Sequence, residues 1–248
     1  MSARERAGEI VVVGRRPAAE AIRARRAREL LIARSAAGAG VKALVNAADR
    51  AGVPVTRVSR ETIERLAGGT SHQGVVVRIS QHVDLRESDL ARRSWTERAV
   101  VVVLDGVTDP QNLGAIARTV EAAGADALIV RRRRGAAITQ AAVKASAGAL
   151  IRLPVARVTN IARAIDRLHD ARFWVVGLAP DGSTSLFEST PPPGRLALVL
   201  GSEGSGLTRL VSERCDERIA IPLRGSVSSL NVSVAAGIAI FAYALRGR

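Results

Sequence analysis

Short apolar runs that recur after residue 99 are the feature that most constrains the fold of this chain. The clearest runs are VVVVL at 100–104, ALIV at 127–130, FWVVGL at 173–178 and LALVL at 196–200. None of them alternates apolar with polar residues, as a strand with one solvated face does, so both faces should be covered. Segments with helical spacing of apolar residues lie between them, at 112–123, 136–147 and 161–169. The pattern predicts an α/β domain with a mostly parallel sheet between layers of helices.

The first 80 residues show a second, smaller α/β pattern. We expect strands at 9–14, 30–33, 51–59 and 73–80, and helices at 18–28 and 41–51. The stretch QHVDLRESDLARRSWTER that follows has no clean period and balances four basic against four acidic residues. It is therefore the candidate linker. We predict an N-terminal domain at 1–80, a linker at 81–98 and a C-terminal domain at 99–248.

The charge balance favours a polyanionic partner. The chain has 37 Lys and Arg against 23 Asp and Glu, a formal net charge of +14, and all the basic residues except Lys42 and Lys144 are arginine. Arginine binds phosphate with a planar fork of donors. An arginine-biased coding composition could produce part of this surplus, but nucleic-acid binding is the stronger explanation. Aromatic residues make up only 2% of the chain, which argues against a base-stacking platform.

Other global features bear on compartment and cofactor class. The one cysteine, Cys215, cannot form an internal disulfide, which favours a reducing cytoplasm. The start, MSARERAGEI, lacks the apolar segment of a secretory signal. The apolar stretch from Ser229 to Leu245 is broken by polar residues and glycine, so a buried or interface helix is favoured over a membrane span. His72, His82 and His169 lack the spacing of a zinc site, and we expect no metal.

Three segments carry polar residues at the ends of predicted strands, where open parallel sheets bind their ligands. The first, LDGVTDPQNLGAIARTVEAAGA, passes from a strand into a helix. Asn112 is a candidate cap for that helix, and Arg118 lies six positions further along it. A capped helix with a surface arginine would give the same pattern.

The other two segments come later in the chain. LALVLGSEGSGL ends in a glycine-rich loop with one carboxylate, Glu203, but it lacks the lysine of a P-loop and the GxGxxG spacing of a dinucleotide site. Alone, it indicates a tight turn. IAIPLRGSVSSLNVSVAAGIAIF places Ser228, Ser229 and Asn231 at the start of a helix. Capping explains one of these, while three small polar residues after a glycine favour a loop that approaches a ligand closely.

A run of four arginines at 131–134 follows the strand predicted at 127–130. It fits a solvated strand end as well as an RNA contact. The sequence does not decide between the two.

Taken together, the three segments resemble the signature motifs of the SpoU/TrmH family of SPOUT methyltransferases. The resemblance rests on DPQNLGAIART, GSEGSGL and IPLRGSVSSLNVSVA and covers residues 99–245. In the first domain, GRRPAAEAI and SHQGVVV resemble the start and end of a small ribosomal-protein-like RNA-binding domain, although Arg16 and Pro17 depart from the family pattern. The two-domain layout is similar to that of the bacterial 23S rRNA guanosine 2′-O-methyltransferases.

The resemblance implies a C-terminal domain with a deep trefoil knot that binds S-adenosylmethionine, and a homodimer with the last helix in its interface. It implies 2′-O-methylation of a ribose in 23S rRNA, at a guanosine. The implied cofactor contacts are Gly201, Ile221, Leu223 and Leu230. The implied catalytic residues are Asn112, Arg118, Glu203, Ser229 and Asn231.

The role of Arg118 and three alternative functions stay open at this point. In related enzymes the matching arginine handles the proton and comes from the partner subunit. A guanidinium stays protonated in proteins, so we expect Arg118 to bind a target phosphate and to stabilise the developing alkoxide. The alternatives are an antibiotic-resistance rRNA methyltransferase, a tRNA ribose methyltransferase and a non-catalytic RNA-binding assembly factor. The last should have lost Arg118, Glu203 or Asn231, and all three are present.

Overall fold

The structure is a computed structural model, and it describes residues 9–69, 71–80 and 85–246. The first eight residues and 81–84, which include the start of the chain and of the predicted linker, lie outside the described residues, as does His82. The chain divides into two compact units. One spans Met1–His82 and Ile138–Arg152, and the other spans Val83–Ala137 and Leu153–Arg248.

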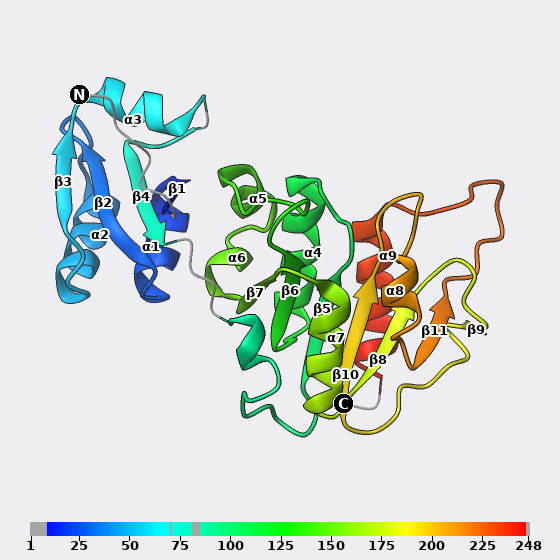
Figure 1. The fold of residues 1–248 in the computed structure, drawn as a ribbon. Coiled ribbons are helices and arrows are strands. Elements are labelled where there is room, and N and C mark those ends of the chain that lie inside the picture. The colour runs from blue at the N-terminus through cyan, green and yellow to red at the C-terminus, as the bar shows by residue number, and fades with distance from the viewer. Residues whose placement is uncertain (1–8, 70, 81–84, 247–248) are drawn as a thin grey trace. The chain divides into compact units, whose positions relative to one another are not determined.

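The larger unit contains a seven-stranded sheet in the order β7-β6-β5-β10-β8-β11-β9 (Figure 1). Every neighbouring pair in it is parallel. Its strands are β5 (Val100–Leu104), β6 (Ala127–Arg131), β7 (Val155–Val158), β8 (Phe173–Leu178), β9 (Thr184–Ser185), β10 (Arg195–Leu200) and β11 (Glu217–Ala220). The predicted parallel α/β fold is confirmed. All five residues of β5 are buried, as its unbroken run of apolar residues predicts.

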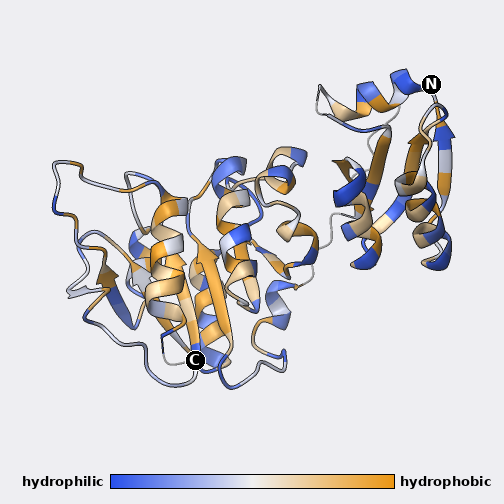
Figure 2. Cartoon of the chain, turned by 180° about the vertical axis from the view of Figure 1, so that it is seen from behind, coloured by the Kyte–Doolittle hydropathy of each residue, from blue (hydrophilic) through white to orange (hydrophobic). Residues whose placement is uncertain are grey.

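Helices cover both faces of this sheet (Figures 1 and 2). On one face lie α4 (Pro110–Ala122) and α9 (Val232–Ala239), and on the other lie α7 (Ile161–Asp170) and α8 (Arg209–Ser212). A 3₁₀ turn, η1 (Glu87–Asp89), precedes β5, and the π-helical turn η2 (Ile240–Ala244) continues α9. Leu85, Leu90 and Trp95 join the apolar core between the sheet and α7.

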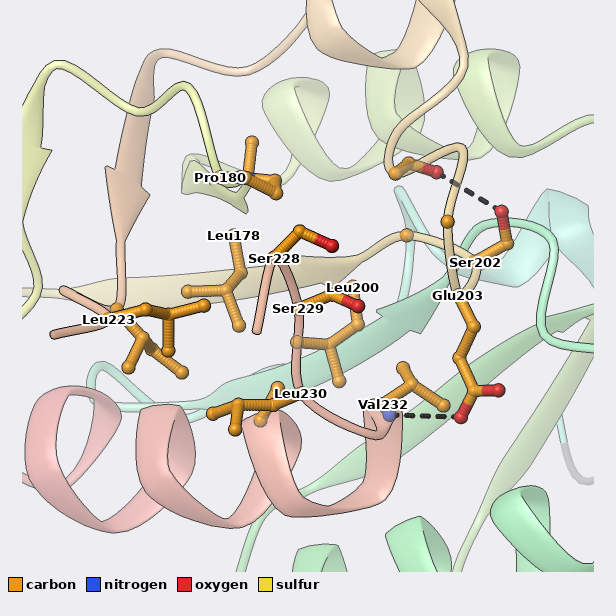
Figure 3. A pocket seen from close by; sticks show the side chains of 16 residues that line it. Leu178, Pro180, Leu200, Ser202, Glu203, Leu223, Ser228, Ser229, Leu230 and Val232 are labelled. Carbon is orange, nitrogen blue, oxygen red and sulfur yellow. Dashed lines mark hydrogen bonds between the residues drawn. The ribbon is translucent and has the colours of Figure 1, made fainter. Parts of the chain in front are cut away.

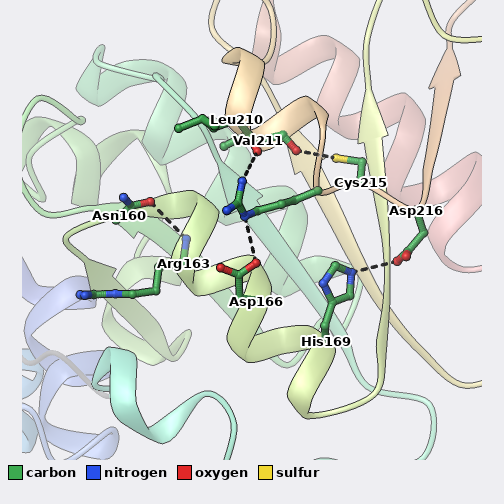
Figure 4. A network of polar contacts seen from close by, with 9 residues as sticks. Asn160, Arg163, Asp166, His169, Leu210, Val211, Cys215 and Asp216 are labelled. Atoms are coloured by element: carbon green, nitrogen blue, oxygen red, sulfur yellow. Dashed lines mark hydrogen bonds and ion pairs between the residues drawn. The ribbon is translucent and has the colours of Figure 1, made fainter.

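Helix α7 shows how local sequence and packing combine in this unit. Asn160 caps the helix by accepting a hydrogen bond from the Arg163 backbone N–H at 3.1 Å. The apolar side chains of the helix are buried. At its far end, His169 Nε2 lies 3.1 Å from a carboxylate oxygen of Asp216, which also accepts from the backbone of β8 (Figure 4). The Cys215 thiol beside it donates to the Val211 carbonyl, and burial raises its pKa to about 12. This thiol is a packed structural group and not a nucleophile.

The smaller unit contains a four-stranded sheet in the order β1-β4-β2-β3. Its strands are β1 (Glu9–Val13), β2 (Ala27–Ala33), β3 (Val55–Val58) and β4 (Val75–Ser80). Strand β4 pairs antiparallel with β1 and β2, while β2 and β3 are parallel. Its helices are α1 (Arg15–Arg23), α2 (Ala39–Arg50), α3 (Arg60–Ala67), α5 (Gln140–Ala145) and α6 (Ala149–Arg152).

Helices α1 and α3 of the smaller unit are examples of departures from the sequence prediction. Helix α1 ends at Arg23 instead of reaching residue 28, because Arg25 has a left-handed φ of 55° and the chain enters β2 at Ala27. Helix α3 was not predicted. It is only eight residues long, with Ser59 as its N-cap and Gly68, at a φ of 54°, as its C-cap.

Arg195, at the start of β10, donates hydrogen bonds to three backbone carbonyls. It donates to the carbonyl oxygens of Trp95 at 2.8 Å, Thr96 at 3.0 Å and Ala171 at 2.7 Å. Its guanidinium therefore joins the segment that precedes β5 to the loop that precedes β8. Hydrogen bonds from a charged donor contribute more than neutral ones, and carbonyls left without a donor are penalised.

We predict that Arg195→Met lowers the free energy of unfolding of the larger unit by about 2 kcal/mol, because three carbonyls lose a charged donor. Urea unfolding followed by tryptophan fluorescence measures this, since both tryptophans, Trp95 and Trp174, lie in that unit. The matched control is Arg209→Met, whose exposed side chain pairs with Glu213, four residues later. That control should change the value by less than about 0.5 kcal/mol. Equal effects of the two substitutions would contradict the prediction.

Candidate active site

A cleft of about 350 Å³ lies where β8, β10 and β11 end (Figure 3). Three loops form its walls: the first follows β8, the second is the glycine-rich loop after β10, and the third leads from β11 to α9. The lining residues are Leu178, Ala179, Pro180, Leu200, Gly201, Ser202, Glu203, Gly204, Gly206, Ile221, Leu223, Ser228, Ser229, Leu230, Val232 and Ala235. The second and third of the sequence-predicted segments therefore meet in one place.

All four predicted cofactor residues line this cleft: Gly201, Ile221, Leu223 and Leu230. The leucine and isoleucine side chains give it apolar walls, and Figure 3 labels Leu223 and Leu230 among them. Residues 222–230 form no backbone hydrogen bond with any residue that the structure describes. Their N–H and C=O groups are therefore free to bind the polar edges of a ligand.

Glycine is required at position 201 by the close approach of two stretches of backbone. A Cβ atom there would lie 2.2 Å from the carbonyl carbon of Gly206. The loop closes on itself through two backbone hydrogen bonds between Ser202 and Gly206, of 3.0 and 3.1 Å. Gly182 meets a similar limit, because a Cβ on it would lie 2.4 Å from the carbonyl carbon of Ile219. At both positions only a residue without a side chain allows the two stretches of backbone to pack this closely.

Three predicted catalytic residues form one hydrogen-bonded cluster. Oε1 of Glu203 accepts from Nδ2 of Asn231 at 2.7 Å, from Nδ2 of Asn112 at 3.1 Å and from the backbone N–H of Val232 at 3.2 Å. The Asn231 amide also donates to Oδ1 of Asn112, at 3.0 Å. These residues come from the glycine-rich loop, the first turn of α4 and the start of α9, and they join the three predicted segments.

One residue of the cluster, Asn231, is a helix cap, but Asn112, which the sequence indicated as a cap, is not. The N-cap of α4 is Asp109, whose carboxylate accepts from the Gln111 backbone N–H at 2.9 Å, with Pro110 at the first helical position. Asn112 therefore lies inside the first turn, and its side chain is free to reach Glu203. Asn231 is the N-cap of α9, accepting from the Ser233 backbone N–H at 2.9 Å.

The remaining two predicted catalytic residues lie apart from this cluster. Ser229 lines the cleft and is exposed. Arg118 is exposed on α4 and forms no hydrogen bond or ion pair with another described residue. Six residues along an α-helix turn a side chain by about 240° and advance it by about 9 Å. Arg118 therefore lies on a different face of α4 from Asn112 and does not join the cluster.

One residue that the sequence did not single out holds the site together. Asp105 is fully buried at the end of β5, where its two carboxylate oxygens accept from Arg131 at 3.3 Å and from the Thr208 backbone N–H at 2.8 Å. It thereby fixes the end of the glycine-rich loop against β5 and β6. The available signal was an aspartate directly after an apolar run, because a buried carboxylate must find partners.

The part of the chain that the structure describes contains no group of three or more His, Cys, Asp or Glu that could hold a metal ion. It also contains no helix that is long and apolar enough to cross a membrane. Helix α9 has eight residues and lies within the apolar stretch from Ser229 to Leu245.

The sequence model of the SpoU rRNA Methylase family matches residues 99–241, which is more than half of the chain. The chain belongs to the SpoU rRNA methylase family. A second family model, described as an RNA 2′-O ribose methyltransferase substrate-binding domain, matches residues 11–83. Together the two matches cover the motifs on which the resemblance in the sequence rests.

Several known proteins are similar to this chain over most of its length. The 23S rRNA (guanosine-2′-O-)-methyltransferase RlmB of Salmonella typhi is 43% identical over 199 residues, 80% of this chain and 82% of that protein. The SpoU methyltransferase AviRb from Streptomyces viridochromogenes, solved in complex with AdoMet, is 29% identical with a TM-score of 0.82, covering 98% of this chain and 92% of that one. An AdoMet-bound rRNA methyltransferase from Sinorhizobium meliloti is 25% identical with a TM-score of 0.83, covering 96% and 88%.

The cleft fits S-adenosylmethionine, the cofactor of this family. Its apolar walls suit the adenine ring, and the unpaired backbone groups of 222–230 suit the polar groups of the nucleoside and the amino acid. The absence of a Cβ at Gly201 lets the glycine-rich loop fold back against residue 206 and form one wall of the cleft.

We predict that Gly201→Ala abolishes binding of S-adenosylmethionine at concentrations that saturate the wild type, because the added Cβ must push the glycine-rich loop aside. Isothermal titration calorimetry measures this affinity, with near-UV circular dichroism as a check on the fold. The matched control is Gly225→Ala in the third loop, where a Cβ meets nothing within 4 Å. Tight binding by Gly201→Ala would show that the close approach of residues 201 and 206 does not shape the cofactor site.

Proposed function

We propose that this protein transfers the methyl group of S-adenosylmethionine to a ribose 2′-hydroxyl of 23S rRNA, at a guanosine. The observation that carries the proposal is the convergence of Asn112, Glu203 and Asn231 beside a cleft lined by the four predicted cofactor residues. The similarity to RlmB over 80% of the chain supports both the substrate and the base. S-adenosylmethionine, when bound, supplies a methyl group that is already activated.

The residues of the cluster position the substrate and do not ionise it. A ribose hydroxyl is a poor nucleophile at neutral pH, so alignment with the donor supplies much of the rate. Glu203 Oε1 is occupied by three donors, while Oε2 accepts no hydrogen bond from the described residues. We assign Oε2 the role of orienting the substrate or the incoming guanidinium. Ser229, which faces the cleft, contributes a further hydroxyl for the bound substrate or donor.

Arg118 acts as a phosphate ligand from the partner subunit in this proposal. A guanidinium does not give up its proton, so it is suited to gripping a phosphate and to stabilising an alkoxide as the proton leaves through that phosphate or through water. Its exposure and its place on another face of α4 support delivery to the cleft of a second subunit.

A homodimer follows from the same assignment. Val234 and Phe241, seven residues apart on α9 and η2, are each more than half exposed, at 52% and 55%. That spacing places both on one apolar face of the C-terminal segment. An exposed apolar face next to the cleft is the surface on which a second copy would bury its own α9 and bring Arg118 within reach.

Residues 1–80 bind the RNA in this proposal, 81–98 connect the domains and 99–248 carry out the methyl transfer. The substrate-binding family match at 11–83 and the surplus of 15 basic over 7 acidic residues in the first 80 support this division. The same first domain makes a tRNA substrate less suitable than rRNA. A reducing cytoplasm, where ribosomal RNA is found, is the proposed location.

The experiment that tests the function maps 2′-O-methylated riboses in ribosomal RNA from cells with and without this protein. Loss of one 2′-O-methylguanosine in 23S rRNA, restored by the wild-type gene and not by Glu203→Ala, is the expected result. Loss of a tRNA modification instead would establish the tRNA alternative. Unchanged ribosomal and transfer RNA would point to the non-catalytic assembly factor.

We predict that Arg118→Ala and Arg118→Lys both abolish methyl transfer to rRNA while binding of S-adenosylmethionine is retained, because lysine lacks the planar fork. Transfer of a tritiated methyl group measures turnover, and calorimetry measures donor affinity. Mixing subunits of Arg118→Ala with subunits of Glu203→Ala should restore activity, since a mixed dimer has one complete site. Near-normal turnover by Arg118→Lys would show that the planar guanidinium is not needed. If the mixed subunits stayed inactive, Arg118 would not act from the partner subunit.

A further inference from the structure

The run of arginines at 131–134 forms a fixed turn at the same edge of the sheet as the active site. Strand β6 ends at Arg131, next to β5, and β5 is flanked on its other side by β10. Leu104 of β5 pairs with Val130 of β6 and with Leu200 of β10 in register. Because neighbouring strands lie about 4.8 Å apart, the start of this turn is about 10 Å from Gly201.

Backbone contacts on both sides hold this turn in place. The Arg132 N–H donates to the Val158 carbonyl at the end of β7 at 2.7 Å, and the Ala136 N–H donates to the Val107 carbonyl in the loop before α4 at 2.8 Å. The Arg157 side chain donates to the Arg132 carbonyl at 3.3 Å. The turn is therefore fastened to the segment that leads to Asn112.

The backbone of the turn is held in a tight conformation. Arg134 has a φ of 58°, a left-handed conformation that a non-glycine residue adopts at an energetic penalty. Gly135 is confined, because a Cβ on it would lie 2.7 Å from the Arg131 carbonyl oxygen. Such a conformation persists where surrounding contacts enforce it, so the turn presents its side chains from a defined backbone.

The arginines of the turn divide into one that anchors and three that are free. Arg131 is paired with the buried Asp105, the same carboxylate that binds the glycine-rich loop at Thr208. Arg132, Arg133 and Arg134 are exposed, and their guanidinium groups pair with no acidic group in the described ranges 9–69, 71–80 and 85–246. Three unpaired guanidinium groups on a rigid turn beside the cleft form a site for several phosphates in succession.

We propose that Arg132, Arg133 and Arg134, here called the arginine turn, bind the backbone phosphates of the RNA strand next to the ribose that is methylated. The inference rests on the proposed function and adds a substrate contact within the methyltransferase domain itself, separate from the N-terminal domain. Phosphate contacts position a strand without reading its sequence. The arginine turn thus adds affinity for the strand that carries the target ribose and leaves the choice of nucleotide to other surfaces.

The test compares two triple variants of the full-length protein on an unmodified 23S rRNA transcript. In the first, Arg132→Gln, Arg133→Gln and Arg134→Gln remove the charges of the arginine turn. In the matched control, Arg92→Gln, Arg98→Gln and Arg172→Gln remove three exposed arginines near the starts of β5 and β8, at the opposite edge of the sheet. Arg172 also has a left-handed φ, of 60°, which matches Arg134.

The first variant should bind the transcript at least about tenfold more weakly, and the slope of log affinity against log salt concentration should fall by about 2. Its affinity for S-adenosylmethionine and its kcat at saturating RNA should stay at wild-type values. The control variant should keep the wild-type slope. Lysine at all three positions of the arginine turn should recover most of the slope, because it restores the charges.

Equal losses in the two triple variants would overturn the inference, because net charge alone would then explain them. Unchanged RNA affinity in the first variant would also overturn it. If the first variant changed its mass in solution while its RNA affinity stayed the same, the turn would contact a second subunit instead, and the inference would fail. A wild-type protein that neither binds nor methylates the transcript would refute the proposed function itself.

Discussion

The arrangement of the active site depends on one carboxylate oxygen, Oε1 of Glu203. It receives donors from the first turn of α4, from the side chain of Asn231 and from the backbone at the start of α9. The Asn231 amide also donates to Oδ1 of Asn112, so the three side chains form one connected cluster beside the cleft. The oxygen therefore joins the starts of both helices to the glycine-rich loop at the cleft. The apolar walls of the cofactor cleft follow from where those helices begin.

Much of the fold could be predicted because its pattern is strong. Unbroken apolar runs such as VVVVL at 100–104 are buried on both faces, and every pair in the large sheet is parallel. The cofactor residues Gly201, Ile221, Leu223 and Leu230 line one cleft because strands that run parallel end at one edge. The family resemblance supplied which residues of those loops to name.

What could not be predicted depends on contacts between distant segments. Helix α3 is too short for its period to stand out against the strands on either side. Asn112 was interpreted as a cap because the sequence does not show that Asp109, three residues earlier, takes that place. Asp105 gave no signal beyond its position after a strand, since its partners Arg131 and Thr208 are 26 and 103 residues away. Pairings of that kind are properties of the assembled sheet.

The order of the site along the chain has a consequence for its biosynthesis. The lining of the cleft runs from Leu178 to Ala235, and the hydrogen-bonded cluster joins Asn112 to Asn231, close to the C-terminus. A ribosome that has made the first two hundred residues has produced most of the sheet but none of the third wall. Nascent or prematurely terminated chains that stop before residue 231 consequently lack a place for the methyl donor, and the cluster cannot form until that segment has been made.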